Sequence, residues 1–110
     1  MTIIRQIDRE MWPDFCVTFS NGNRGRLLRI EVHQDDQGDN QVVGSGPLLG
    51  VAFDPLGKGN DIVVTTGREV EEYTHRIPAP IEVHELQTNV GQVTMLEIID
   101  QNNTKTTLSF

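Results

Sequence analysis

The sequence predicts a mainly β fold of the α+β class, with one N-terminal helix packed on an antiparallel sheet or small barrel. Three observations support this: one stretch of helical period near the start, period-two runs through the remainder, and turn-forming clusters at regular intervals. They predict about six strands. With 110 residues, residues 1–110 should form one domain, helical over about 8–20 and β-rich over about 26–110.

The helical segment carries one apolar stripe at the spacing of a 3.6-residue period. Its members are Trp12, Phe15, Cys16 and Phe19. Asp8 is the expected N-cap residue, because its carboxylate can accept from free N–H groups of the first turn. Pro13 leaves two alternatives, a single turn over residues 8–12 followed by a helix that begins at Pro13, or one kinked helix. We favour the first.

The first two strands follow the glycines that end the helix. Residues 26–33 alternate, with Leu28, Ile30 and Val32 on one face, which is the pattern of a half-buried strand. The polar segment 34–41 predicts a hairpin tip. Residues 41–53 read as a strand with a bulge or bend at Gly44, Gly46 and Pro47.

The later strands are separated by further turns. The β-branched run 62–66 is a strand, and residues 73–77 precede a bend or a move to a sheet edge at Pro78 and Pro80. Residues 81–86, 93–99 and 106–110 complete the β region, with a tight turn over 100–103.

The chain is acidic, with a formal net charge of −7. This argues against a nucleic-acid partner, because neutralisation of phosphates supplies most of such binding. Residues 1–29 hold five arginines against three acidic residues. These arginines could form a small patch for an anionic ligand, but a solvated face is the favoured interpretation. They are Arg5, Arg9, Arg24, Arg26 and Arg29.

Several classes of site are disfavoured. The single cysteine, Cys16, excludes an intramolecular disulfide and a cysteine-based zinc site, and its place on the apolar stripe predicts a core residue. No apolar run approaches the roughly 20 residues of a membrane span, so we expect a cytoplasmic protein without a membrane partner. We expect no cofactor and no resident metal, and no motif predicts a catalytic residue.

Two loops resemble ligand sites and are better explained as turns. Residues 57–60 (Gly-Lys-Gly-Asn) lack the length and the hydroxyl of a phosphate loop. Asp35, Asp36 and Asp39 could bind calcium weakly, but they lack the spacing of an EF-hand, which favours a solvated hairpin tip.

The histidines provide the one candidate ligand site. His33 and His84 alternate with apolar residues and should face solvent. His75 shares a strand face with Tyr73 and, with Arg76, could orient an anionic metabolite. Strand alternation places Arg76 on the other face, which weakens this hypothesis, and a structural role for His75 is favoured.

The sequence also resembles a known family. The matching segments are residues 7–15 (Ile-Asp-Arg-Glu-Met-Trp-Pro-Asp-Phe), 47–55 (Pro-Leu-Leu-Gly-Val-Ala-Phe-Asp-Pro), 73–83 (Tyr-Thr-His-Arg-Ile-Pro-Ala-Pro-Ile-Glu-Val) and 96–100 (Leu-Glu-Ile-Ile-Asp). Together with the Thr-rich last strand they resemble DUF5335, a bacterial family of unknown function. The resemblance covers nearly the whole chain and implies one domain, but it implies no activity.

The absence of catalytic motifs and the small sheet with apolar rows indicate a non-enzymatic binding or homo-oligomeric assembly module. Such sheets often cover exposed edges by self-association or with a protein partner. The alternative is a small-ligand-binding protein or enzyme with a pocket near Tyr73 and His75.

Overall fold

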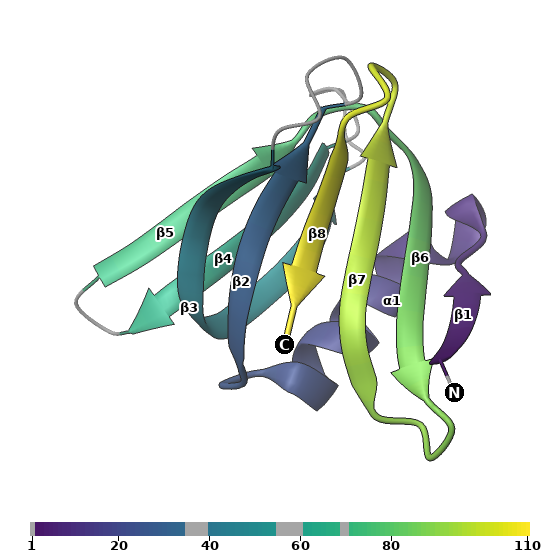
Figure 1. Cartoon of the computed structure of the whole chain (residues 1–110), viewed down its shortest axis with the longest axis horizontal. Coiled ribbons are helices and arrows are strands. Elements are labelled where there is room, and N and C mark those ends of the chain that lie inside the picture. Colours follow the sequence, from purple (N-terminus) through teal and green to yellow (C-terminus); the bar gives the residue numbers. More distant parts are fainter. Residues whose placement is uncertain (1, 35–39, 55–60, 69–70) are drawn as a thin grey trace.

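The computed structural model of the chain describes residues 2–34, 40–54, 61–68 and 71–110. These residues form two helical segments and eight strands (Figure 1). In chain order they are β1 (Thr2–Gln6), the 3₁₀ turn η1 (Arg9–Met11), α1 (Trp12–Asn23), β2 (Leu27–His33), β3 (Asn40–Asp54), β4 (Asp61–Arg68), β5 (Glu71–Ile77), β6 (Pro80–Thr88), β7 (Val93–Asp100) and β8 (Lys105–Ser109).

The described strands form one open antiparallel sheet in the order β1-β6-β7-β8-β2-β3-β4-β5. The mainly β prediction with one helix is therefore confirmed, whereas the count of about six strands is too low and a closed barrel is not observed. β1 and β5 are the two edge strands and lie on opposite sides of the molecule (Figure 1). β1 escaped prediction because all five of its residues are exposed, so it shows no period-two pattern.

The sheet bends sharply along β3, whose two halves have different neighbours. Its first half pairs with β2 and its second half with β4. Register shifts occur at Ile30/Glu31, opposite the first half, and between Leu48 and Gly50 on the β4 side. Gly46 lies between them with φ 140°, which favours glycine. The predicted bulge is thus present, but the strand continues through it.

The helix confirms the first of the two alternatives for Pro13. η1 ends at Met11 and α1 begins at Trp12, with Pro13 in its first turn, where the missing N–H costs no hydrogen bond. The predicted cap is wrong. Asp8 precedes η1 and makes no side-chain capping bond; its backbone carbonyl instead accepts from the N–H of Met11.

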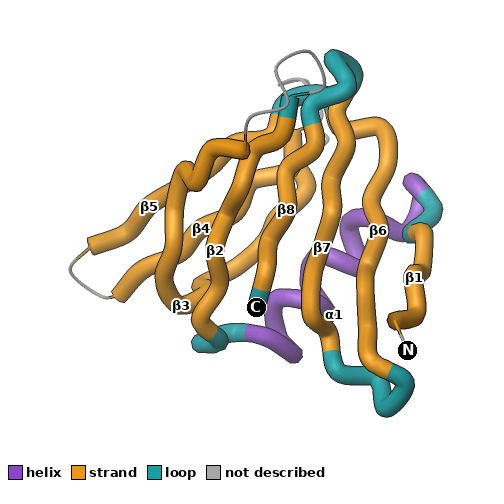
Figure 2. Tube along the Cα trace, viewed as in Figure 1, coloured by secondary structure: helices purple, strands orange, loops and turns teal. Residues whose placement is uncertain are grey.

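The predicted apolar stripe of α1 faces the core. Trp12, Cys16 and Phe19 are buried, and Phe15 packs against the same cluster. The helix itself lies on one side of the curved sheet (Figure 2). The buried aliphatic residues from the strands are Leu28, Ile30, Leu48, Val51, Ile62, Val64, Ile77, Val83, Leu96, Ile98 and Leu108.

The helix also covers part of the edge of β3. β2 starts at Leu27, opposite Pro47, so the residues of β3 beyond that point lack a strand on this side. The hydroxyl of Ser20 accepts from the N–H of Val51 at 2.8 Å and lies 3.0 Å from the carbonyl oxygen of Val51. Gly25 donates to the carbonyl of Leu48. A helix therefore satisfies backbone groups that would otherwise form an exposed edge.

The two bends predicted from composition are both present. Residues 78 and 79 connect β5 at one edge to β6 on the other side of the sheet, and Ala79 has a positive φ of 46°. In the turn between β7 and β8, a carboxylate oxygen of Asp100 accepts from the N–H groups of Asn102 and Thr104. Neither helical segment is long and apolar enough to cross a membrane.

Candidate functional site

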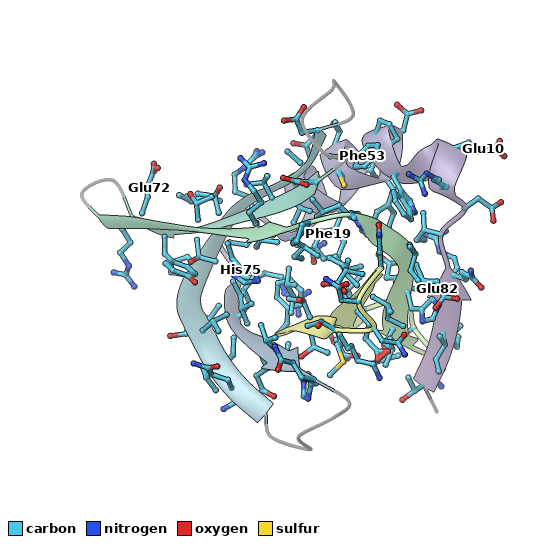
Figure 3. The ribbon with its side chains drawn as sticks, turned by 90° about the horizontal axis from the view of Figure 1, so that it is seen from above. Glu10, Phe19, Phe53, Glu72, His75 and Glu82 are labelled. Atoms are coloured by element: carbon cyan, nitrogen blue, oxygen red, sulfur yellow. The ribbon has the colours of Figure 1, made fainter. Side chains whose placement is uncertain are left out.

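The structure brings two of the three predicted site residues together. Tyr73 and His75 stand opposite Thr66 and Val64 of β4, and both β4 residues are fully buried. Tyr73 and His75 therefore project from the inner face of β5, with their rings stacked at a centroid distance of 6.5 Å. In Figure 3, His75 and Glu72 extend from opposite sides of the β5 ribbon.

Arg76 lies on the outer face, away from these two rings. Its Nη1 donates to Oδ2 of Asp61 at 2.8 Å, and the Asp61 side chain is almost fully buried. Arg76 is therefore engaged in an ion pair across β4 and β5. The structure thus separates Arg76 from the Tyr73–His75 pair, as strand alternation requires.

A cleft of about 430 Å³ lies beside Tyr73, within the volume range of small-molecule sites. It is formed where β3 bends, where β4 ends and where β5 begins. We call it the β3–β5 cleft. Its lining residues are Ser45, Gly46, Pro47, Thr66, Gly67, Arg68, Glu72 and Tyr73.

Glycines shape this cleft at three positions. Gly46 and Gly67 have φ values of 140° and 126°, which disfavour any side chain. A Cβ on Gly46 would lie 3.8 Å from the backbone nitrogen of Gly67, so the lining here is bare backbone. At Gly44 a Cβ would lie 2.7 Å from the ring of Tyr73. The Tyr73 ring therefore occupies space that a larger residue at position 44 would fill.

Thr66 gives the cleft its most unusual polar group. Its side chain is 0% exposed, and its Oγ1 has no hydrogen-bond partner among the described residues. An unpartnered buried hydroxyl costs about 1–3 kcal/mol of stability. A buried hydroxyl that lacks a hydrogen bond in the free protein is a candidate to form one with a ligand.

Arg68 supplies the positive charge of the cleft. It lies two residues after Thr66 on β4, so alternation places both on the same face, and it makes no ion pair with another described side chain. His75 adds no positive charge near neutral pH, because burial lowers its pKa from the usual 6.5. Glu72 reaches the rim but points to the outer face (Figure 3).

The comparisons with known proteins can now be set beside this geometry. The family model described as a family of unknown function, DUF5335, matches residues 3–110. The chain belongs to DUF5335. An uncharacterized protein of Aquifex aeolicus (strain VF5) is 27% identical over 101 residues, which cover 92% of this chain and 86% of that protein. No solved structure matches. The family predicted from the sequence is therefore confirmed, and it brings no activity with it.

The other histidines of this DUF5335 chain lie away from the cleft. His33 Nε2 is 3.3 Å from Oγ1 of Thr107 and 3.6 Å from Oε2 of Glu31. His84 stands opposite Glu97 on neighbouring strands of the sheet. Both histidines are partly covered rather than fully solvent-facing. Within the described part of the chain, no three His, Cys, Asp or Glu side chains gather closely enough to hold a metal ion.

The basic N-terminal residues do not form one patch. Arg5 donates to Glu85, Arg24 to the carbonyl of Leu49, and Arg26 to Asn23 and to the carbonyl of Val93. Arg9 lies over the ring of Trp12, and Arg29 pairs with Glu31. Because each of these arginines contacts a different group, the five side chains do not converge on one site for an anion.

Cys16 is a core residue, as predicted. It is buried against the sheet, and burial raises the pKa of its thiol to about 11, which makes it a poor nucleophile. The loop predictions at residues 35, 36 and 39 and at residues 57–60 lie outside the described residues.

Sequence reasoning missed the residues that define the cleft. The β-branched run 62–66 places Thr66 in a strand but does not mark out its hydroxyl, and no motif distinguishes Arg68 from Arg76. A signal was available, because alternation carries the inner face of this β-branched strand through Thr66 to Arg68. The approach of Gly46 from β3 gave no sequence signal, since it depends on how the sheet bends.

Proposed function

We propose that this protein is a non-enzymatic binding module that holds a small molecule in the β3–β5 cleft. The observation that carries the proposal is the buried, unpartnered hydroxyl of Thr66, a residue that lines this cleft. Natural proteins tend to retain a destabilising buried polar group without a hydrogen bond where that group has a function. Here the function would be a hydrogen bond to a ligand.

Binding is favoured over catalysis by the surroundings of His75. Catalysis by a histidine requires a hydrogen bond to a nucleophile or to a group that orients the ring. His75 stacks on Tyr73 and has no hydrogen bond with another described side chain. The ring therefore supports the aromatic wall of the cleft.

Native mass spectrometry of the protein purified gently from its own cells tests this proposal. We expect an additional mass on the wild-type chain that is lost in Thr66→Val. Thr65→Val is the matched control, because Thr65 is the preceding residue and its side chain projects from the other face of β4. A wild-type protein without bound mass, under conditions that preserve non-covalent complexes, would count against the proposal.

Homo-oligomeric assembly through β1 is a second candidate function. β1 is a sheet edge, and its Ile4 and Ile3 are 65% and 44% exposed. β5, the other edge, carries two exposed charged residues, Glu72 and Arg76, against one on β1, Arg5, and exposed charges discourage strand addition. This asymmetry favours β1 as the edge that another copy of the chain covers.

Sedimentation equilibrium tests the assembly candidate. We expect a concentration-dependent dimer that Ile4→Lys converts to monomer. Ile81→Lys is the control, since Ile81 is also exposed but lies on β6, inside the sheet. A wild-type protein that remains monomeric at high concentration would exclude this function.

A further inference from the structure

The charge of the β3–β5 cleft points to the chemistry of its ligand, provided that the cleft binds a small molecule as proposed. Arg68 is the cation that lines the cleft, and it is exposed and free of ion pairs with the other described residues. Thr66 offers a hydroxyl proton, and its cross-strand neighbour Tyr73 offers a second. A guanidinium and two hydroxyl donors together favour a ligand that only accepts hydrogen bonds, which is an anion.

The number of charges favours a monoanion. Among the described residues that line the cleft, Glu72 is the other charged one, and its side chain points to the outer face (Figure 3). His75, next to Tyr73 on the same face of β5, adds no positive charge near neutral pH, because burial lowers its pKa. The whole chain carries −7. A single guanidinium in a negatively charged protein matches a carboxylate, which it can bind through two parallel hydrogen bonds, better than a dianionic phosphate.

The remaining surface of the cleft favours a flat, apolar body. Tyr73 is 39% exposed, and its ring is stacked with that of His75 at an interplanar angle of 18°. Pro47 lines the same cleft, and Gly46 and Gly67 leave bare backbone beside it. A planar group can lie against such surfaces more closely than a branched one.

We infer that the cleft takes a small organic monocarboxylate with a planar apolar body. Its carboxylate pairs with Arg68 and accepts a hydrogen bond from Thr66, while the body packs on the ring of Tyr73. Because Thr66 is fully covered and Tyr73 is the exposed residue opposite it, we expect the Tyr73 ring to turn outward when the carboxylate enters.

The test uses benzoate as the probe and benzamide as its neutral counterpart of the same shape. Isotope-labelled protein is titrated with each, and backbone amide shifts are followed by NMR. We expect benzoate to shift residues 45–46, 66–68 and 73, and to bind about tenfold or more tightly than benzamide, since a hydrogen bond to a charged group is lost with the neutral compound.

Two arginine variants test whether benzoate binding depends on the positive charge of Arg68. Arg68→Gln should weaken benzoate about tenfold or more and abolish the preference over benzamide. Arg76→Gln is the control, because Arg76 lies on the outer face with Asp61, and it should leave benzoate binding unchanged. Loss of binding in Arg76→Gln but not in Arg68→Gln would overturn the inference.

A third variant tests the movement of Tyr73. In Gly44→Ala the new methyl group would meet the Tyr73 ring at 2.7 Å, and the ring, being exposed, can turn outward. We expect benzoate affinity to change in Gly44→Ala while the unfolding transition stays close to wild type. Unchanged benzoate affinity would show that the Tyr73 ring does not contact the ligand.

The outcomes distinguish this inference from the proposed function. Equal binding of benzoate and benzamide at the cleft, lost in Thr66→Val, would refute the carboxylate but retain the binding module. If benzoate caused no amide shifts at the cleft, the inference of a carboxylate ligand would also be refuted. The binding-module proposal would then depend only on whether native mass spectrometry finds a co-purified ligand.

Discussion

Replacing Thr66 with valine should make the protein more stable. Valine has nearly the same shape as threonine, with a methyl group in place of the hydroxyl. In the structure that hydroxyl is buried without a partner among the described residues, and its removal should recover about 1–2 kcal/mol of unfolding free energy. For a chain of this size the gain raises Tm by roughly 4–8 °C.

Urea unfolding followed by tryptophan fluorescence measures this change. The chain has one tryptophan, Trp12, which is buried in the core and therefore reports the loss of native packing. We expect a higher transition midpoint with an unchanged slope in Thr66→Val, because the surface exposed on unfolding stays the same.

The reverse change at Val64 is the matched control. Val64 lies on the same strand and the same face as Thr66 and is equally buried. Val64→Thr introduces a buried hydroxyl and should lower the unfolding free energy by about 1–3 kcal/mol. If Thr66→Val were no more stable than wild type, the Thr66 hydroxyl would already be satisfied in solution, and the argument for a reserved ligand group would fail.

Three further predictions concern single residues. Ser20→Ala should lower the unfolding free energy by about 1–3 kcal/mol, because the N–H of Val51 loses its acceptor; an equal loss in the exposed control Thr18→Ala would contradict this. Cys16, with a pKa of about 11, should react with Ellman's reagent only at the rate of unfolding, so rapid labelling of the native protein would refute its burial. Because burial lowers the pKa of His75 in the folded state, the unfolded chain binds that proton more readily, and stability should fall as pH drops below about 6.5 until the folded-state pKa is reached. His75→Gln should flatten this dependence in urea titrations, and identical slopes would disprove the assignment.

The parts of the fold that depend on local pattern were predictable. The stripe of Trp12, Cys16 and Phe19 identified the buried face of the helix, and Pro13 marked its first turn. The alternation in residues 26–33 identified a strand, and Asp100 introduced a turn that its own carboxylate closes. In each case the signal lies within a few residues of the element that it predicts.

Features that depend on distant contacts were not predictable. Asp8 has the chemistry of a helix cap, but η1 separates it from α1. Alternation correctly separated Arg76 from His75, yet it could not show that the bend of β3 brings Gly46 next to Gly67. The cleft therefore exists because of tertiary structure, although the face on which Tyr73 projects follows from the sequence.

The position of β1 has a consequence for the synthesis of this protein. Thr2 pairs with Thr88 of β6, so β1 is synthesised well before its partner strand and cannot join the sheet until β6 has followed. Such long-range pairing forms slowly. Until then the isoleucines of β1 remain available to other nascent chains, and the early part of translation is the period in which chaperones would protect this protein most.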